Sequence, residues 1–213
     1  MFDVKHHIAD DLMAAYAAGS LPHPYALVVA SQISMNDEAR ARYEAQLAVG
    51  GSVLDGLGSS EISGDFKSRL MDMLDDAPAE PIRAPRRPQG VFPAPLMEAM
   101  NGRQPKWKSL GFGVKQSIIY AGEDGSTRLL YIPAGQAVPE HGHNGLEMTL
   151  VLQGAFSDEG GRYGVGDVEV TDEDVDHVPV AEEGLPCICV AATNAPLRFK
   201  GFLPRMLQPV FGI

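Results

Sequence analysis

The spacing of apolar residues changes across a proline-rich segment at residues 77–105. Seven of the chain's 16 prolines lie in this segment. Because proline disfavours the interiors of helices and sheets, we expect a linker in largely extended form. Apolar residues have helical spacing before the segment and strand spacing after it. The sequence therefore predicts an α+β chain with a helical domain at residues 1–76, the linker at 77–105 and a β-domain at 106–213.

Four helical segments are expected before the linker. They are marked by Ile8, Leu12 and Tyr16, by YALVVASQI after Pro24, by the capping pair Asn36 and Asp37, and by Phe66, Leu70 and Leu74. Gly19 is expected to end the first helix, and Gly50 with Gly51 the third. Together the segments predict a small helical bundle of about 70 residues, which is marginally stable on its own because of its size.

Short segments of period two begin after Trp107. They are VKQSII, TRLLYI, EMTLVLQG, DVEV and CICVAA, and turn sequences rich in glycine and acidic residues separate them. Many short strands with no helix between them are typical of an antiparallel barrel or jelly roll. The second half of the chain is therefore expected to be a β-barrel.

The acidic composition narrows the classes of function. The formal net charge is −11, whereas contacts to nucleic-acid phosphates require a basic face. The N-terminus MFDVKHHIADDLM has no apolar signal region, and no stretch approaches the roughly 18 consecutive apolar residues of a membrane span. We therefore expect a cytoplasmic protein that contacts neither nucleic acid nor membrane directly.

Residues 135–154, GQAVPEHGHNGLEMTLVLQG, combine strand character with metal-binding side chains. Side chains of like parity point to the same face of a strand, so His141, His143 and Glu147 can converge. Two imidazoles and a carboxylate suit zinc, iron, manganese or nickel, and a fourth ligand would close the shell. His177 is the best candidate, because it lies past the next turn and is the remaining histidine of this half. The sequence thus predicts one divalent metal in the β-domain.

The spacing of glycines, histidines and glutamate in residues 135–154 resembles the first motif of the cupin superfamily. This resemblance implies a cupin-like β-barrel, or jelly roll, that holds one metal inside. The second cupin motif is matched less closely, because Gly164 stands where the family usually has proline. His177 also follows Gly166 by eleven residues rather than by three. This departure leaves the fourth ligand open.

Longer segments resemble the ChrR-type anti-sigma factors, in which a zinc-binding anti-sigma domain precedes a cupin-like domain. They are HHIADDLMAAYAAGSLPHPYALVVAS, HGHNGLEMTLVLQGAF, GDVEV, CICVAATNAPLRF and FLP. The resemblance implies that the helical domain binds an extracytoplasmic-function sigma factor and releases it under singlet-oxygen or related oxidative stress. It also implies a zinc in the cupin-like domain, with the ligands His141, His143, Glu147 and His177.

The N-terminal zinc site of that family is mostly missing from this sequence. The family pattern is a histidine near the start and a later His-x3-Cys-x2-Cys. Here His7 matches the first position, but Gln32, Asn36 and Ala39 occupy the later three. None of these is a thiolate, and alanine has no ligand atom. We therefore predict no zinc in the helical domain, whose helices must be held by packing, by docking on the barrel or by the partner.

Two alternatives to the anti-sigma function follow from the same residues. The first is a metal-dependent cupin enzyme such as a dioxygenase, since a site of three histidines and a glutamate can bind water or oxygen. Against it, the sequence shows no further general acid or base, and an enzyme has no need of the helical domain. The second is a cupin protein whose altered helical domain has lost sigma binding.

The chain has two cysteines, Cys187 and Cys189, in the expected strand CICVAA. Residues i and i+2 of a strand are about 6.5–7 Å apart, near or beyond the limit for an unstrained disulfide. We expect two buried, reduced thiols, with a redox-sensing pair as the alternative.

Overall fold

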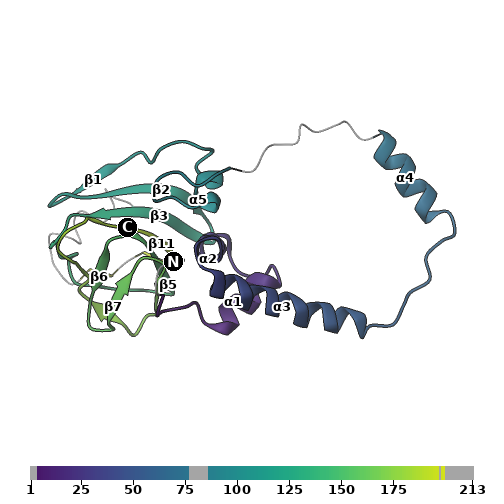
Figure 1. Cartoon of the computed structure of the whole chain (residues 1–213), viewed down its shortest axis with the longest axis horizontal. Coiled ribbons are helices and arrows are strands. Elements are labelled where there is room, and N and C mark those ends of the chain that lie inside the picture. Colours follow the sequence, from purple (N-terminus) through teal and green to yellow (C-terminus); the bar gives the residue numbers. More distant parts are fainter. Residues whose placement is uncertain (1–3, 77–85, 197, 200–213) are drawn as a thin grey trace.

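The computed structural model describes residues 4–76, 86–196 and 198–199, and its fold is α+β as predicted. Helices precede an antiparallel β-sandwich (Figure 1). The helices are α1 (Asp10–Ala17), α2 (His23–Met35), α3 (Asp37–Asp55), α4 (Phe66–Asp76) and α5 (Ala94–Ala99). None of the helices in the described ranges is both long enough and apolar enough to cross a membrane.

The ends of the first three helices follow from local sequence, with one exception. Gly19 has a φ of 70° just after α1, and the side chain of Asn36 accepts a hydrogen bond from the Ala39 amide at 2.7 Å at the start of α3. The expected end of α3 at Gly50 and Gly51 is wrong, because the helix continues to Asp55. Glycine costs about 1 kcal/mol in a helix interior relative to alanine, which weakens a helix without ending it.

The helical half is not a bundle of all four expected helices. α1, α2 and α3 pack against one another, and the rings of Tyr16 and Tyr43 lie 5.3 Å apart between α1 and α3. By contrast, residues 47–75 are exposed throughout. The distal half of α3 and the whole of α4 project from the body of the molecule as an arm (Figure 1). We call residues 47–75 the arm.

The β-domain consists of one large and two small antiparallel sheets. The large sheet has the order β1-β2-β3-β11-β5-β8, and the small sheets have the orders β10-β6-β7 and β12-β4-β9. The strands are β1 (Lys108–Gly111), β2 (Val114–Gly122), β3 (Gly125–Ile132), β4 (His141–Gly142), β5 (Glu147–Gln153), β6 (Ala155–Ser157), β7 (Arg162–Gly164), β8 (Val168–Thr171), β9 (Asp176–His177), β10 (Val180–Ala181), β11 (Cys187–Thr193) and β12 (Arg198–Phe199).

Helix α2 covers one face of the large sheet and shares its apolar core. Val28 and Val29 of α2 are fully buried in the same cluster as Leu150 of β5 and Val190 of β11. Side chains alternate between the two faces of a strand. The residues of β5 and β11 in this cluster therefore face α2, and their neighbours in the sequence face the sandwich interior. Helix α2 is thus held by apolar packing on the sheet, and α1 and α3 pack on α2.

The proline-rich segment departs from the extended form that was expected. Part of it, residues 77–85, lies outside the described residues, but residues 94–99 form helix α5, which packs against α2. Pro93 and Pro95 stand at the start of α5, where backbone N–H groups have no partner within the helix, so proline is tolerated there. Leu96 and Met97 are buried in the core under α2. The segment therefore contributes to the core as well as connecting the two halves.

The N-terminal residues before α1 lie along the edge of the β-domain. The amides of Lys5 and His6 donate to Oδ1 of Asp167 at 2.6 and 2.8 Å, and the amide of Val168 donates to the His6 carbonyl at 2.9 Å. The His6 ring also packs on Tyr163, with 4.6 Å between centroids. These contacts attach the first residues of the chain to β7, β8 and the turn between them.

Candidate metal centre

Three histidines from separate parts of the β-domain meet inside the sandwich. His141 lies in β4 and His143 follows it, while His177 lies in β9. The antiparallel pairing of β4 with β9 places His141 directly opposite His177, although 36 residues separate them. All three side chains are at most 4% exposed, so the pairing of two very short strands brings the distant histidine to the buried site.

The ring nitrogens of these histidines have a spacing that fits a metal ion. Nε2 of His177 lies 3.2 Å from Nε2 of His143 and 3.2 Å from Nε2 of His141. Nitrogen ligands on a tetrahedral zinc, with Zn–N bonds of 2.0–2.1 Å, are about 3.3–3.4 Å apart. The histidine triad therefore has the geometry of three corners of such a site, and its chemistry suits zinc or a similar divalent ion.

Hydrogen bonds on the outer side of the triad orient two of the rings. Nδ1 of His141 lies 2.9 Å from the Pro139 carbonyl, and Nδ1 of His177 lies 2.7 Å from Oδ2 of Asp158. Both oxygens are acceptors, so each Nδ1 carries the hydrogen and each Nε2 presents its lone pair to the centre. This is the tautomer that a metal ligand needs.

Glu147, the fourth predicted ligand, lies beside the triad at the start of β5. One carboxylate oxygen is 3.5 Å from Nδ1 of His143, and the other accepts a hydrogen bond from the Thr149 hydroxyl at 3.2 Å. Burial by itself raises the pKa of Glu147, but His143 and the other two histidines outweigh it and hold the pKa below its usual value. The side chain is thus a buried carboxylate in contact with the triad, and its direct ligation of the metal stays a prediction.

Two acidic residues that were not predicted, Asp158 and Glu169, surround His177. Oε1 of Glu169, in β8, lies 3.4 Å from Nδ1 of His177 on the same side as Asp158. Burial raises the pKa of Glu169 to about 7. Burial lowers the pKa of His177, but the two carboxyl groups outweigh this effect and raise the pKa to about 9. The two carboxyl groups therefore favour the charged form of His177, and metal binding has to displace a proton from its Nε2.

The local sequence gives little sign that these two acids are functional. Asp158 belongs to the turn SDEGGR, where acidic residues are usually solvated, and Glu169 belongs to the short segment DVEV. The alternation of DVEV does place Glu169 on the opposite face from its two valines, which is a weak signal.

The contact of Asp158 with His177 predicts a loss of metal affinity on substitution. In Asp158→Asn the anionic partner of Nδ1 is removed, and zinc affinity is expected to fall about 10–100-fold. Competition with a chromogenic chelator measures the change. Glu173→Gln, which alters an exposed acid of the same domain, is the matched control. Unchanged affinity in Asp158→Asn would contradict a role in orienting His177.

Of the four positions that match the family's N-terminal zinc site, one precedes α1 and the other three lie at the end of α2 and the start of α3. Nε2 of His7 is 3.5 Å from a carboxylate oxygen of Glu38, and Ala39 is fully buried. Gln32 is also fully buried, and its Nε2 donates to the Gly166 carbonyl at 3.0 Å and to the His6 carbonyl at 3.3 Å. Polar contacts of an uncharged amide thus connect α2, the N-terminal residues and the β-domain. The absence of a zinc there stays a prediction.

The buried amide of Gln32 predicts a loss of stability when it is removed. Gln32→Leu keeps much of the volume but leaves the carbonyls of His6 and Gly166 without this donor, so we expect a loss of about 2–3 kcal/mol in the free energy of unfolding. Urea denaturation followed by circular dichroism measures it. Gln46→Leu, on a partly exposed position of α3, should change stability by less than about 0.5 kcal/mol. Equal effects of the two substitutions would contradict the role of Gln32.

Cys187 and Cys189 are free and buried in β11, as expected. A hydrogen bond with Cys187 and burial both raise the pKa of the Cys189 thiol. Cys189 is therefore a neutral thiol near the metal centre, on the same wall of the sandwich interior as Ala191.

Comparisons with known proteins are consistent with this arrangement of domains. The family model described as ChrR Cupin-like domain matches residues 97–195. Anti-sigma-E factor ChrR of Cereibacter sphaeroides is 49% identical over 212 residues, which cover 99% of each chain. The solved structure of Rhodobacter sphaeroides SigE in complex with the anti-sigma ChrR matches 89% of this chain and 99% of that chain, with 46% identity and a TM-score of 0.78. An acetylacetone dioxygenase from Acinetobacter johnsonii matches 46% of this chain and 73% of that chain, but with only 14% identity and a TM-score of 0.41.

Proposed function

This chain belongs to the ChrR family of anti-sigma factors, and we propose from that premise that it binds and inhibits an extracytoplasmic-function sigma factor. The identity of 49% extends over 99% of both chains, so it includes the helical half as well as the cupin-like domain. The solved relative with a TM-score of 0.78 is a complex of SigE with ChrR. This similarity over the whole length is the observation that carries the proposal.

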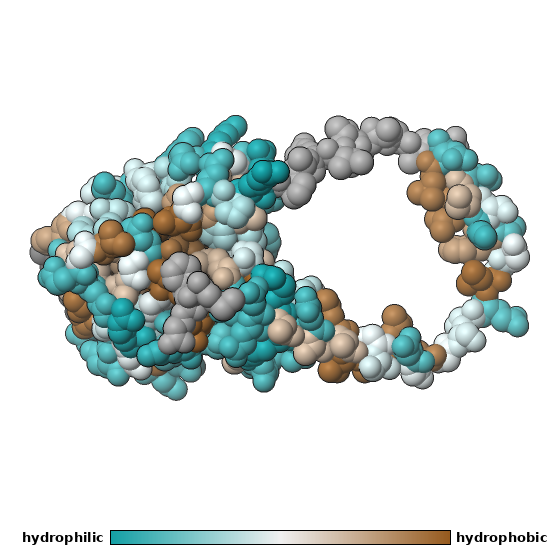
Figure 2. Space-filling model, viewed as in Figure 1, coloured by the Kyte–Doolittle hydropathy of each residue, from teal (hydrophilic) through white to brown (hydrophobic). Residues whose placement is uncertain are grey.

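The arm is the surface that we assign to the sigma factor. Its large apolar side chains are exposed, and on α4 they recur at helical spacing on one face; they are Leu47, Val49, Val53, Leu54, Leu57, Ile62, Phe66, Leu70, Met71, Met73 and Leu74. Figure 2 shows them along α3 and α4. Exposed apolar surface of this extent is typical of a binding site, and an amphipathic helix fits a groove on a partner. The net charge of −11 favours a partner with basic faces, which sigma factors need for DNA.

We also propose that the metal centre holds one zinc ion, with His141, His143 and His177 as ligands and Glu147 as the fourth. The 3.2 Å spacings of the Nε2 atoms and the oriented tautomers support this assignment. Zinc has no redox chemistry of its own, and its binding free energy becomes folding free energy. The ion would thus hold β4, β9 and the start of β5 together.

The regulatory signal is proposed to be oxidative, of the singlet-oxygen type. Cys189 lies on the wall of the sandwich interior near the metal centre, so a change at that centre would alter the packing of β11. The other face of β11 packs under α2, which leads into the arm through α3. A change at the metal or at the thiols would in this way shift the protein from the state that inhibits the sigma factor to a state that releases it. A sigma factor acts on RNA polymerase, so the protein is proposed to be cytoplasmic.

Neither alternative has comparable support. The likeness to the dioxygenase is too low to carry an argument for catalysis, and the full-length relative is a regulator, so this chain is not an enzyme. Loss of sigma binding along with the helical zinc ligands is disfavoured by the structure of the helical half. α2 packs on the sheet, α1 packs on α2 and α3, and the arm keeps its exposed apolar face.

Co-expression tests the proposed function. The full-length protein, tagged, is produced together with the extracytoplasmic-function sigma factors of its own genome, and transcription by core polymerase with the captured sigma factor is measured with and without the protein. We expect a one-to-one complex and inhibited transcription. Capture of none of these sigma factors would overturn the proposal.

A further inference from the structure

Helix α2 lies against the large sheet (Figure 1), and hydrogen bonds as well as apolar packing hold its N-terminal end there. The hydroxyl of Thr127, in β3, donates to the Pro24 carbonyl at 3.2 Å. The hydroxyl of Tyr25 donates to the Leu146 carbonyl at 2.8 Å, across 121 residues of sequence. The first turn of α2 is therefore attached to two separate segments of the β-domain.

The contact made by Tyr25 lies next to the metal centre. Its side chain is 3% exposed and belongs to the apolar core that α2 shares with the sheet. Burial raises the pKa of Tyr25 to about 12, the backbone of Asn194 opposes this rise, and the nearby charge of Glu147 adds to it. The acceptor, the Leu146 carbonyl, stands one residue before that glutamate. A buried donor on the helix thus holds the backbone that leads into a predicted metal ligand.

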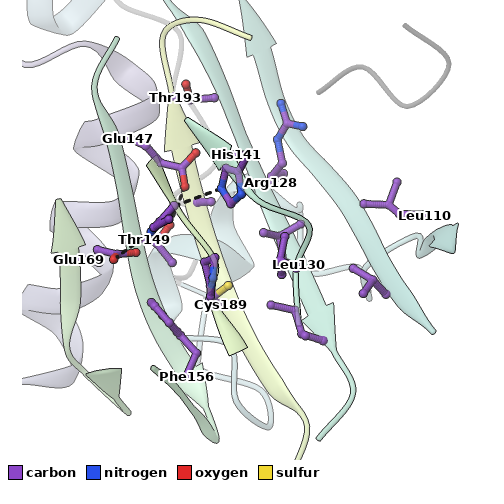
Figure 3. Close-up of a pocket in the computed structure, with 16 residues that line it drawn as sticks. Leu110, Arg128, Leu130, His141, Glu147, Thr149, Phe156, Glu169, Cys189 and Thr193 are labelled. Carbon is purple, nitrogen blue, oxygen red and sulfur yellow. Dashed lines mark hydrogen bonds and ion pairs between the residues drawn. The ribbon is translucent and has the colours of Figure 1, made fainter. Parts of the chain in front are cut away.

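Leu146 and Glu147 connect the two faces of the sheet. The side chain of Leu146 packs on the core under α2. The Glu147 carboxylate points into the sandwich interior, toward His141, as Figure 3 shows. The Leu146 carbonyl and the N and Cα atoms of Glu147 lie in one peptide plane, so the hydrogen bond from Tyr25 fixes the plane from which the Glu147 side chain starts. The helix therefore helps to set the position of the carboxylate.

We propose that Tyr25 is a positioning residue of the metal centre, supplied by the helical half of the chain. Its hydroxyl orients the peptide unit before Glu147, and through it the carboxylate that contacts the histidine triad. This role rests on the metal centre and the anti-sigma function proposed above, because it gives the contact through which the first acts on the second. If docking of α2 strengthens metal binding, metal binding must strengthen the docking of α2 by the same factor.

The helix that this contact holds leads to the arm. α2 ends at Met35, α3 begins at Asp37, and the distal half of α3 belongs to the arm. α3 also packs against α1 and α2. Loss of the metal would remove a restraint on Glu147 and so weaken the hold of the β-domain on the first turn of α2. The base on which the arm stands would then be less firmly docked.

Removal of the hydroxyl tests the effect of the helix on the metal. Tyr25→Phe keeps the ring in the core and removes only the donor to Leu146. Chelator competition on the full-length protein should show a loss of about tenfold in zinc affinity, an effect typical of groups that orient ligands. Tyr43→Phe, which removes a hydroxyl from the contact of α1 with α3, is the matched control and should change the affinity by less than about twofold. Equal zinc affinities of Tyr25→Phe and the unchanged protein would overturn the proposal.

Amide hydrogen exchange tests the effect of the metal on the helix. Exchange at residues 25–29 is measured relative to β3 with and without saturating zinc, which corrects for the stabilisation that zinc gives the whole fold. We expect zinc to slow this relative exchange at least about fivefold in the unchanged protein and less than about twofold in Tyr25→Phe. An equal response of the two proteins would contradict the role of the hydroxyl. So would exchange in the unchanged protein that does not respond to zinc, a result that needs no variant.

Zinc content of the same samples separates this role from the proposals on which it rests. Unchanged protein that holds one zinc per chain, with the same affinity in Tyr25→Phe, would remove the role of Tyr25 and leave the metal centre. Unchanged protein that holds no zinc would remove both. Capture of the sigma factor is measured independently, so the anti-sigma function is decided by that experiment alone.

Discussion

Purified His143→Ala protein is expected to contain no stoichiometric zinc, whereas the unchanged protein is expected to carry about one zinc per chain. His143 supplies one of three buried ring nitrogens that lie 3.2 Å from a neighbouring Nε2. Because this substitution removes one metal ligand, we expect zinc affinity to fall at least about 100-fold. This loss is larger than the one expected for substitution of a residue that only orients a ligand. Elemental analysis gives the zinc content, and chelator competition gives the affinity.

The same substitution should lower the thermal stability that zinc provides. A ligand that binds only the folded state stabilises it, so the melting temperature of the unchanged protein should fall on chelation, while that of His143→Ala should not respond. His23→Ala is the matched control, because His23 is an exposed histidine at the start of α2, away from the triad. Tight, stoichiometric zinc in His143→Ala would show that the triad is not the site.

The double substitution Leu70→Glu and Leu74→Glu is expected to abolish sigma binding without unfolding the protein. Both side chains lie on the apolar face of α4 and are 46% and 61% exposed, so neither contributes to the core. Two charges in a desolvated interface should weaken the complex at least about 100-fold, which corresponds to about 2.8 kcal/mol. Surface plasmon resonance with the sigma factor measures affinity, and thermal unfolding should be unchanged.

Ser68→Glu on the opposite face of α4 is the control for this experiment. It adds a charge to the same helix but away from Leu70 and Leu74, so we expect sigma binding to change by less than about threefold. A sigma complex of normal affinity in the double variant would show that α4 is not the binding surface. Equal losses in Ser68→Glu and the double variant would indicate a general effect of charge.

Much of the fold could be predicted from local patterns, and the errors have a common cause. The start of α3 at Asn36 depends on a hydrogen bond within three residues, and it was predicted correctly. The persistence of α3 through Gly50 and Gly51, the separation of α4 from the other helices and the short helix α5 were not. Each depends on what the segment packs against, or fails to pack against, and local composition does not contain that information.

The residues of the metal centre likewise fall into those that the sequence predicted and those that only the folded structure identified. The sequence by itself indicated that His141, His143 and Glu147 belong together, because they lie within one short stretch of chain. The expected reason, side-chain parity along a single strand, is wrong, since β4 ends at Gly142 and β5 begins at Glu147. Only the tertiary structure placed His177 opposite His141, since that contact depends on the pairing of two strands far apart in the sequence. It also decided that Asp158 and Glu169 are buried beside His177. Burial and long-range pairing change the chemistry of a side chain, and both arise only when the whole chain has folded.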